Sequence, residues 1–440
     1  MLEMEAGQRT APVQKEEPQA VRAQTLAQKI IARAAGRSHV APGEIVTCKV
    51  DLAMFHDSSG PRRLKPMLED LGARIWDPSR VVLVMDHYVP EQDDDARRIV
   101  RIARDWAHEQ ALPHVYDGLG ICHVVLPQKG HLRPGMFCVG GDSHSPTGGA
   151  FGAYMFGIGS TEMLGVVVTG AIWLRVPQTL RLRWEGKLAP GVSAKDMMLH
   201  TVGALGMNGG GYQAVEFCGP AVRALGMAER MTLCNMSAEL GAQAGLVAAD
   251  QTTLDWLART GVPRAQLETL EGDEGAAAQE YSFDAGMLAP QVAAPHSPAN
   301  TREVGAFAGT EVDVAYIGAC TGAKLEDLVA AAGVLQGRRV AQGVRLLVAP
   351  ASRHDQQQAE SLGVMRVLRD AGAEVLPNAC GACAGYGAAF GENTTVISST
   401  ARNFRGRMGP ASVQVYLASP ATVAASALRG CITDPREVLA

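Results

Sequence analysis

Hydrophobic and polar residues alternate along the first part of the chain with two different periods. Apolar residues recur at helical spacing in TLAQKIIARAAG, residues 25–36, and in DDDARRIVRIARDWAHEQ, residues 93–110. Short and nearly continuous apolar runs lie between and after these segments, in EIVTCKVDLAM, RVVLVMDHY, ICHVVLP and MFCVGGD. Such runs are typical of buried strands. Short strands that alternate with helices predict an α/β fold with mostly parallel sheets.

The alternation divides the chain into three α/β units. The first covers residues 25–177, and the second, 178–300, opens with a β-like LRLRWEG and continues through two helical segments. The end of the second unit is rich in Gly, Ala and Pro, and we interpret it as a linker. The third unit, 301–440, alternates again from VDVAYIGAC to TTVISST. Residues 1–24 are polar and lack any period, which predicts a disordered tail.

Composition narrows the function classes. Forty Lys and Arg against 45 Asp and Glu leave a net charge of −5, and only 5% of residues are aromatic, which argues against nucleic acid as the main partner. No apolar run reaches the roughly 20 residues of a membrane helix, and the N-terminus has no secretion-signal pattern, so we expect a cytoplasmic protein without membrane contact. Nine cysteines, an odd number, favour reduced, metal-bound or buried thiols over a disulfide framework.

Polar side chains follow most of the predicted strands, and one more lies inside the run ICHVVLP. Ligands of open parallel sheets bind beyond the carboxyl ends of strands, where loops converge and helix N-termini point at the site. The same kinds of side chain recur in the first and third units, so we expect a site between units. The set is Asp86, His87, His123, Asp142, Ser143, His144, Cys320, Cys380 and Arg402.

Three cysteines are candidate ligands of a metal centre. Cys380 and Cys383 form a C-x2-C pair inside the small-residue run NACGACAG, and Cys320 lies in GACTG. Small neighbours would let backbone amides approach a sulfur-rich cofactor. Buried inert cysteines, a redox pair and a zinc site are also compatible with this spacing. Three thiolates on a cubane cluster would leave one iron without a protein ligand, and that iron could act as a Lewis acid.

Two Asp/His pairs are candidates for acid chemistry. Asp86 with His87, and Asp142 with His144, could orient an imidazole and hold it charged, as a general acid requires. Each pair also has a simpler interpretation, because a histidine in a turn can be a satisfied capping or core residue and Asp142 could begin a helix.

Two further pairs could bind a cofactor or a substrate. Asn235 and Glu239 lie four residues apart on one face of a predicted helix, where they could also be no more than a polar patch. Arg402 and Arg407 could clamp a dicarboxylate, because a guanidinium fork matches carboxylate geometry. A solvated basic loop is the alternative.

Taken together, these motifs resemble those of the aconitase superfamily of hydro-lyases, most closely the branch of 3-isopropylmalate dehydratase large subunits and homoaconitase-like chains. The likeness runs from about Thr25 to Cys431. It rests on segments in the family's order and spacing: MDHYVP, GICHVVLPQKG, GGDSHSPTGGAFGA, GIGSTEM, MTLCNMSAELGAQAG, PQVAAPHSP, CTG, CGAC and RNFRGRMG. Such a series is far more specific than any one motif.

The resemblance implies a role for each candidate residue. The thiols that would bind one 4Fe-4S cluster, with one iron lacking a protein ligand, are Cys320, Cys380 and Cys383. The pair that would protonate the departing hydroxyl is Asp86 with His87. The residues that would surround the hydroxyl and water on that iron are His123, Asp142, His144 and Glu239. Asn235 would support the cluster, and Arg402 and Arg407 would bind the substrate carboxylate.

The resemblance also implies a partner and a substrate class. In the family the base is a serine on a mobile fourth domain, which in this branch belongs to a small subunit, and few residues follow Arg402. We therefore expect three α/β units around a central cluster site, without the swivelling fourth domain and active only with a small subunit. The expected substrate is a branched hydroxy dicarboxylate: 3-isopropylmalate and 2-isopropylmalate of leucine biosynthesis first, then dimethylmalate, methylmalate or homoaconitate.

Several positions depart from the family's pattern, among them Ser145 in place of Thr, Ala379 in place of Gly and Ala384 in place of Leu. Ala319, Gly322, Ala382 and Ala401 stand where the family has Ser, Asn, Pro and Asn, so the surroundings of the cluster and the substrate are altered. Two other hypotheses belong to different classes. The chain could be a clusterless binding protein, such as a metabolite sensor or an RNA-binding apo form, or it could keep the fold and use CGAC as a zinc or redox site.

Overall fold

The computed structural model describes residues 23–386 and 390–439. The tail predicted at residues 1–24 lies outside the described residues except for its last two, and of these Gln24 is buried and its backbone N–H donates to Asp273. Helix α1, Leu26–Ala34, follows directly. Thr25 and Gln28 cap its start reciprocally.

The first sheet has five parallel strands in the order β4-β3-β2-β5-β6. Its strands are β2 Leu52–His56, β3 Val81–Met85, β4 His114–Asp117, β5 Phe137–Gly140 and β6 Tyr154–Gly157. Its helices include α2 Pro61–Leu71, α3 Asp94–Glu109, α4 Cys122–Gln128 and α5 Ser160–Thr169. Strands β2, β3 and β5 are buried throughout, which explains their continuous apolar runs.

One predicted strand is two strands in the structure. The segment EIVTCKVDLAM spans β1, Ile45–Lys49, and the start of β2. Strand β1 pairs with β7, Ala171–Arg175, in a separate antiparallel ribbon.

The prediction of a strand at ICHVVLP is wrong. These residues form helix α4, and the strand of this region is the preceding β4. A short apolar run looks the same in a buried helix as in a buried strand. Strand β4 lies at the edge of the sheet and is half exposed, so it lacks the apolar run that marks its neighbours. His123 therefore comes from the first turn of a helix.

The second and third sheets are also mostly parallel. The second has the order β10-β9-β8-β11, with β8 Thr179–Glu185, β9 Ala214–Cys218, β10 Ala244–Val247 and β11 Gln279–Asp284. The third has the order β13-β12-β18-β17-β14-β15-β16, with β12 Gln291–Ala293, β13 Thr301–Glu303, β14 Val314–Ile317, β15 Arg345–Val348, β16 Ala373–Val375, β17 Thr395–Ser398 and β18 Gln414–Ala418. The stretch interpreted as a linker is therefore not a linker, because it supplies β11 of the second sheet and β12 of the third. Strand β12 pairs antiparallel with both β13 and β18.

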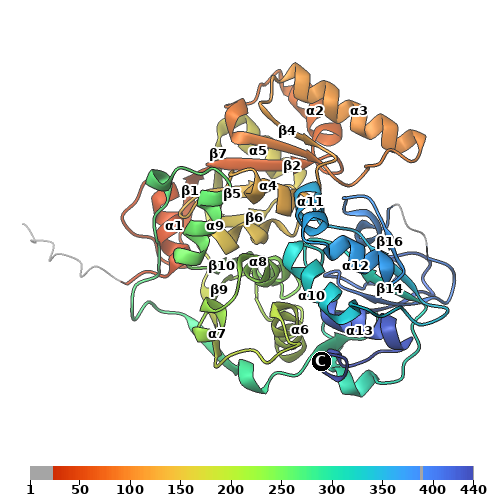
Figure 1. Cartoon of the computed structure of the whole chain (residues 1–440). Coiled ribbons are helices and arrows are strands. Elements are labelled where there is room, and N and C mark those ends of the chain that lie inside the picture. The colour runs from red at the N-terminus through yellow and green to blue at the C-terminus, as the bar shows by residue number, and fades with distance from the viewer. Residues whose placement is uncertain (1–22, 387–389, 440) are drawn as a thin grey trace, which may run out of the picture.

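Helices surround these two sheets, and α8 lies where the three sheets meet (Figure 1). Around the second sheet they are α6 Ala194–Leu205, α7 Pro220–Arg223, α8 Met227–Asn235 and α9 Gln251–Arg259. Around the third they are α10 Leu325–Leu335, α11 Arg353–Ser361, α12 Val364–Asp370 and α13 Pro420–Arg429. Helix α8 packs against β10, against α10, and against η2, the 3-10 helix Ser145–Phe151 of the first unit.

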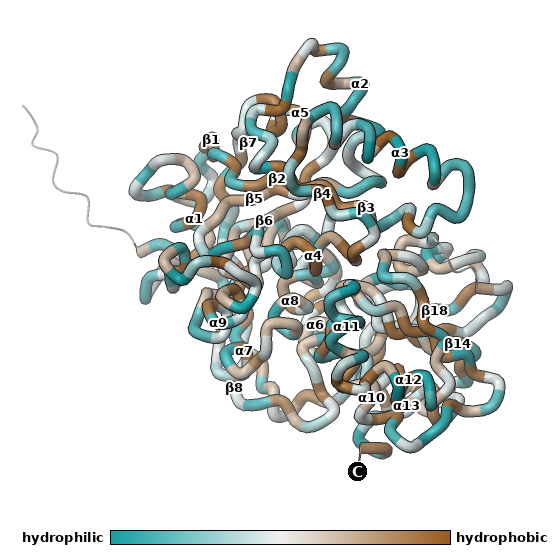
Figure 2. Tube along the Cα trace, turned by 45° about the horizontal axis from the view of Figure 1, so that its top comes forward, coloured by the Kyte–Doolittle hydropathy of each residue, from teal (hydrophilic) through white to brown (hydrophobic). Residues whose placement is uncertain are grey.

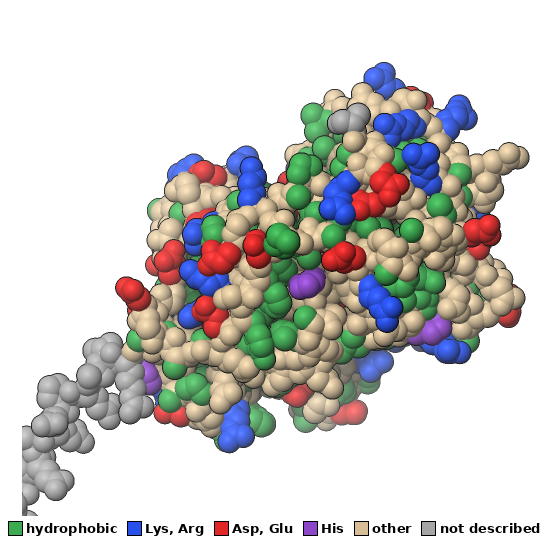
Figure 3. Space-filling model, turned by 90° about the horizontal axis from the view of Figure 1, so that it is seen from below, with side chains coloured by type: hydrophobic (Ala, Val, Ile, Leu, Met, Phe, Trp, Pro, Cys, Tyr) green, Lys and Arg blue, Asp and Glu red, His purple; other side chains and the backbone are tan. Residues whose placement is uncertain are grey.

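The surface agrees with the charge composition. Hydrophobic segments lie mainly along the inner strands, and outer helices such as α11 are hydrophilic (Figure 2). On the face drawn in Figure 3, acidic and basic side chains are interspersed rather than gathered into one basic stripe. Within the described residues, none of the helices combines the length and the apolar character needed to cross a membrane.

Candidate active site

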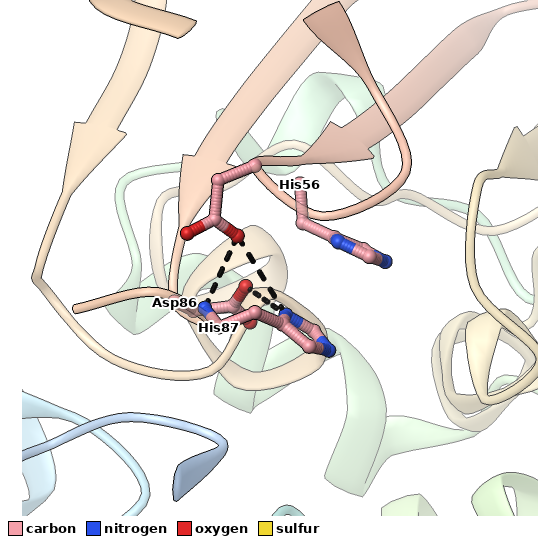
Figure 4. Close-up of side chains that lie close together, drawn as sticks. His56, Asp86 and His87 are labelled. Atoms are coloured by element: carbon pink, nitrogen blue, oxygen red, sulfur yellow. Dashed lines mark hydrogen bonds and ion pairs between the residues drawn. The ribbon is translucent and has the colours of Figure 1, made fainter. Parts of the chain in front are cut away.

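The Asp86–His87 pair lies directly beyond β3, at the carboxyl edge of the first sheet. Asp86 is fully buried, and its Oδ1 lies 2.7 Å from Nδ1 of His87. Its Oδ2 accepts the backbone N–H of Cys122 at 2.7 Å. Its backbone carbonyl accepts the backbone N–H of Cys380 at 2.8 Å, which ties the pair to the third unit. Figure 4 shows the carboxylate of Asp86 beside the ring of His87.

His87 is arranged to carry a positive charge. Burial disfavours that charge, but the carboxylates of Asp86, Asp57 and Asp142 outweigh burial and raise the pKa of His87 to about 9. Burial also opposes ionisation of Asp86, yet His87 holds the pKa of this carboxyl below its ordinary value. Because Nδ1 of His87 faces Asp86, Nε2 is the ring nitrogen that can give its proton to a ligand.

Asp142 follows β5 and contacts two further histidines, His123 of α4 and its neighbour His144. Its Oδ1 lies 2.8 Å from Nε2 of His123 and accepts the backbone N–H of His144 at 2.7 Å. Burial works against the charge on Asp142, but His123 above all keeps the pKa of this carboxyl well below its ordinary value. The carboxylate therefore stays ionised and fixes both residues.

Glu239 lies between His144 and Arg402. Its Oε1 is 2.9 Å from Nε2 of His144 and 2.6 Å from Nε of Arg402. Burial opposes the charge of Glu239, but these two neighbours lower its pKa to about 2. Arg402 also donates from Nη1 to Oγ of Ser143 at 3.0 Å. The second carboxylate oxygen of Glu239 has no hydrogen-bond partner among the described residues.

The three candidate cysteines come together at the carboxyl edge of the third sheet. Cys320 follows β14 after Ala319, whose φ is 67°, and Cys380 and Cys383 belong to the turn around the 3-10 helix Gly381–Ala384. Burial raises the pKa of Cys320 to about 12, and the charge of Cys383 adds to the rise. Cys380 interacts electrostatically with both of the others. Binding a metal here would therefore require these thiols to lose their protons.

Asn235 and Arg407 lie beside these thiols. Asn235, the last residue of α8, places Nδ2 3.2 Å from Sγ of Cys320 and 2.8 Å from Oγ1 of Thr147. Burial disfavours the charged form of Arg407, but the charges of Cys383 and Cys380 outweigh burial and raise its pKa. Its Nε has no hydrogen-bond partner among the described residues. The two predicted clamp arginines therefore have different neighbours, since Arg402 faces Glu239.

A cavity of about 330 Å³ opens next to Arg402. Its polar lining includes Asp142 and Ser143, and Ile158 contributes an apolar surface. The complete lining is Gly141, Asp142, Ser143, Gly157, Ile158, Tyr212, Ala238, Ala242, Gln243 and Arg402. The substrate-sized space therefore reaches Asp142, the member of the carboxylate–imidazole groups that is among its described lining residues.

The structure adds residues that the sequence analysis does not select. His56 and Asp57 follow the apolar run of β2 just as Asp86 and His87 follow β3, so the same rule would have found them had the strand been extended past Met54. Lys195 of α6 is buried and donates to the carbonyls of Ser399 at 2.9 Å and Thr400 at 2.6 Å. A single lysine at the start of a largely buried helix carries no sequence signal for such a role.

Comparison with known proteins identifies the family. The model of the Aconitase family (aconitate hydratase) matches residues 28–308 and 302–430. The chain belongs to the aconitase family. This membership confirms the predicted fold class, an aconitase-like α/β fold with mostly parallel sheets.

Several family members are similar over nearly their whole length. The 3-isopropylmalate dehydratase large subunit 1 of Methanopyrus kandleri is 45% identical over 94% of this chain and 99% of its own. A probable methanogen homoaconitase large subunit of Methanosarcina mazei is 44% identical over 88% of this chain and 99% of its own. A probable 3-isopropylmalate dehydratase large subunit of Methanothermobacter thermautotrophicus is 42% identical over 93% of this chain and 98% of its own.

The aconitase family implies a 4Fe-4S cluster, and the residues of this chain fit one. Thiols are the donors that iron–sulfur clusters prefer. Cys320 and Cys383 are buried, and the partly exposed Cys380 interacts electrostatically with both. Nε of Arg407 and Oδ1 of Asn235 are buried polar atoms beside them, and neither has a hydrogen-bond partner within residues 23–386 and 390–439. Cys320, Cys380 and Cys383 are therefore the residues that would hold the cluster.

Proposed function

We propose that this chain is the large subunit of an iron–sulfur hydro-lyase that reversibly dehydrates a branched hydroxy dicarboxylate. The observation that carries the proposal is the junction of an acid pair with the thiols, because the backbone of Asp86 accepts a hydrogen bond from Cys380. The family and the large-subunit relatives support it.

His87 is the proposed general acid. Hydroxide is a poor leaving group, so its departure requires a proton donor. His87 is protonated at neutral pH because its pKa is about 9, and Asp86 orients the ring so that Nε2 donates to the departing oxygen. When bound, a cluster with one iron free of protein ligands would supply a Lewis acid for the substrate oxygen.

The remaining site residues would hold the substrate and water. Those that would surround the departing hydroxyl are His123, Asp142, His144 and Glu239. Arg402 would bind a substrate carboxylate, with its guanidinium oriented by Glu239 and Ser143. Arg407 would bind carboxylate from the side of the thiols, and Asn235 would support the cluster through its hydrogen bond to Cys320.

The cavity favours a dicarboxylate with an apolar branch. Ile158, Ala238 and Ala242 form an apolar part of its wall, and Arg402 is the one cation among the described residues that line it. A tricarboxylate such as homoaconitate would have to place its third carboxylate against this apolar wall. We therefore propose isopropylmalate as the substrate, ahead of dimethylmalate, methylmalate and homoaconitate.

A small subunit is the proposed source of the base that removes the carbon-bound proton. The carboxylates nearest the cavity are poor bases, since the pKa of Asp142 lies well below its ordinary value and that of Glu239 is about 2. The mobile domain of that subunit would close over the cavity. The corresponding location of the complex would be the cytoplasm.

Cluster content and turnover, measured on the same samples, test the proposal. The chain and its small subunit are loaded with iron and sulfide without oxygen and offered the four candidate acids, and the unsaturated product is followed in the ultraviolet. We expect Cys383→Ser to lose both cluster and turnover. Cys48→Ser should keep both, because Cys48 is a buried thiol of β1 outside the site. Full turnover by Cys383→Ser, or zinc without iron and sulfide in the wild type, would refute the proposal.

A further inference from the structure

The end of β2 brings two buried groups to the acid pair for which the proposed function has no role. Asp57 accepts the backbone N–H groups of His87 at 3.1 Å and of Tyr88 at 2.8 Å. The ring of His56 stacks on the ring of His87, with centroids 4.0 Å apart and planes 16° from parallel. Figure 4 shows the two rings side by side, with Asp86 next to His87. The side chain of His56 is only 4% exposed, which limits direct contact with a substrate.

Hydrogen bonds determine the charge state of His56. Its Nδ1 accepts the backbone N–H of Ser59 at 3.3 Å, and a backbone N–H can only donate. Nδ1 therefore carries no proton, and the ring is neutral with its proton on Nε2. That nitrogen lies 3.2 Å from Oγ of Ser59 and 3.7 Å from Oδ2 of Asp142.

A neutral ring of His56 avoids repulsion between the two stacked histidines. His87 faces Asp57 and His56 from β2, Asp86 from β3, and Asp142 from the loop after β5. If His56 were also protonated, two positive rings would lie 4.0 Å apart. A neutral aromatic face instead attracts the cation on His87. His56 also lies between His87 and Asp142, and so connects the two carboxylate–imidazole groups.

We infer that His56 is a positioning residue for the acid: as a neutral ring it holds His87 by stacking and directs Nε2 of His87 toward the substrate. The inference rests on the proposed function in one respect, because that function gives His87 its proton transfer. The alternative is that the stacked pair only fills space between β2 and β3. The two possibilities differ in what happens to His87 when the ring of His56 is lost.

Three variants of the loaded complex separate these possibilities. His56→Leu removes the ring, whereas His56→Phe keeps a stacking ring without nitrogens. His131→Gln is the matched control, since His131 is a partly buried histidine whose Nε2 contacts the hydroxyl of Tyr116 away from the site. We expect His56→Leu to lower kcat about tenfold with KM within about twofold, and His56→Phe to recover most of the loss. The control should keep wild-type values.

A second readout does not depend on turnover. With 13C-labelled histidine, the imidazole signal of His87 is assigned through His87→Gln and followed against pH in the complex. We expect the midpoint of His87 to fall by about half a pH unit in His56→Leu and to stay at the wild-type value in His56→Phe.

The outcomes distinguish this inference from the proposed function. Wild-type kcat and an unchanged His87 midpoint in His56→Leu would overturn the inference, as would equal losses in the Leu and Phe variants. If His56→Leu does not fold, a His56→Phe variant with kcat lowered as much as in His87→Gln overturns it, and one near wild type supports it. If the wild-type complex shows no hydro-lyase turnover, the proposed function fails, while the titration of His87 still decides the inference.

Discussion

Each buried carboxylate at the centre of the site lies against a histidine or an arginine. Glu239 contacts His144 and Arg402 through one oxygen, and Asp142 contacts His123. Removing one partner of a buried pair leaves the other charge uncompensated, which costs about 3–5 kcal/mol. The site is therefore held together by the same contacts that prepare it for catalysis.

Glu239→Gln should reveal this coupling as a pH-dependent loss of stability. The pKa of Glu239 is lowered from 4.5 to about 2, so its contribution is fully present above pH 4.5 and is lost as the pH falls toward 2. We expect the variant to lose about 3 kcal/mol at neutral pH and to approach the wild type in acid. Urea unfolding of both proteins between pH 3.5 and pH 7 measures the difference. A gap that stays constant over this range would contradict the assignment.

We expect the deprotonation of His87 to set the alkaline limb of the pH–rate profile. A general acid must be protonated, and the pKa of His87 is raised to about 9, so kcat/KM should fall about tenfold per pH unit above that value. His87→Gln should reduce turnover at pH 7.5 by about a hundredfold and flatten this limb. His114→Gln, outside the site, serves as control. An alkaline limb that persists unchanged in His87→Gln would assign the titration to another group.

At the residue scale, the sequence predicts the site wherever a polar residue follows an apolar strand. Asp86 and Asp142 satisfy this rule and lie beyond β3 and β5. Asp57 does not satisfy it, because the predicted strand ends at Met54 and β2 continues to His56. The effect of a departure from the family pattern can be explained only from the structure. At Gly322, a Cβ would lie 2.2 Å from Oγ of Ser399, so the hydroxyl occupies the space of the family's side chain.

At the scale of elements, the contact of η2 with β10 positions His144. Gly149 in η2 lies so close to β10 that a Cβ would be 1.7 Å from the carbonyl oxygen of Gly245. We expect Gly149→Ala to separate these elements, with a loss of about 1–3 kcal/mol and reduced turnover. Gly165→Ala in α5, where no atom lies within 4 Å of the added Cβ, should instead gain about 0.5–1 kcal/mol. Urea midpoints of both variants check this, and equal midpoints would contradict it.

The type of an element can be predicted from sequence where the hydrophobic period and the length of the segment indicate the same type. Helix α3 has a long amphipathic pattern and an acidic start, and it forms as predicted, whereas the short run of α4 was assigned to the wrong class. Strand β12 has no strand pattern of its own, because it lies in a Pro-rich stretch and forms only by pairing with β13 and β18. Pairing between distant segments is not encoded in a local pattern.

At the scale of the whole molecule, the three sheets are joined by contacts that no local sequence pattern predicts. The backbone N–H of Ile121 donates to the carbonyl of Ala351 at 2.9 Å, and Lys195 donates to carbonyls after β17. Burial lowers the pKa of Lys195 to about 8, so this junction is sensitive to alkaline pH. The sequence predicts a site between units but not which groups face each other, because that depends on how the units pack.

We expect the reaction to be divided between two chains. His87 is protonated at neutral pH, and Asp142 and Glu239 are too weakly basic to remove a carbon-bound proton, so the chain alone holds an acid without a matching base beside its cavity among the described residues. We expect the isolated, cluster-loaded chain to give no product and to exchange no carbon-bound hydrogen of the substrate in D2O.

Adding the small subunit should start both processes together, and a small subunit whose candidate serine is changed to alanine should bind but restore neither. Mass spectrometry of the recovered substrate measures the exchange, and ultraviolet absorption measures the product. Turnover by the chain alone at the rate of the complex would show that the base lies on this chain. The cavity beside Arg402 would then have to contain it, which makes the pH dependence of that turnover the next discriminating observation.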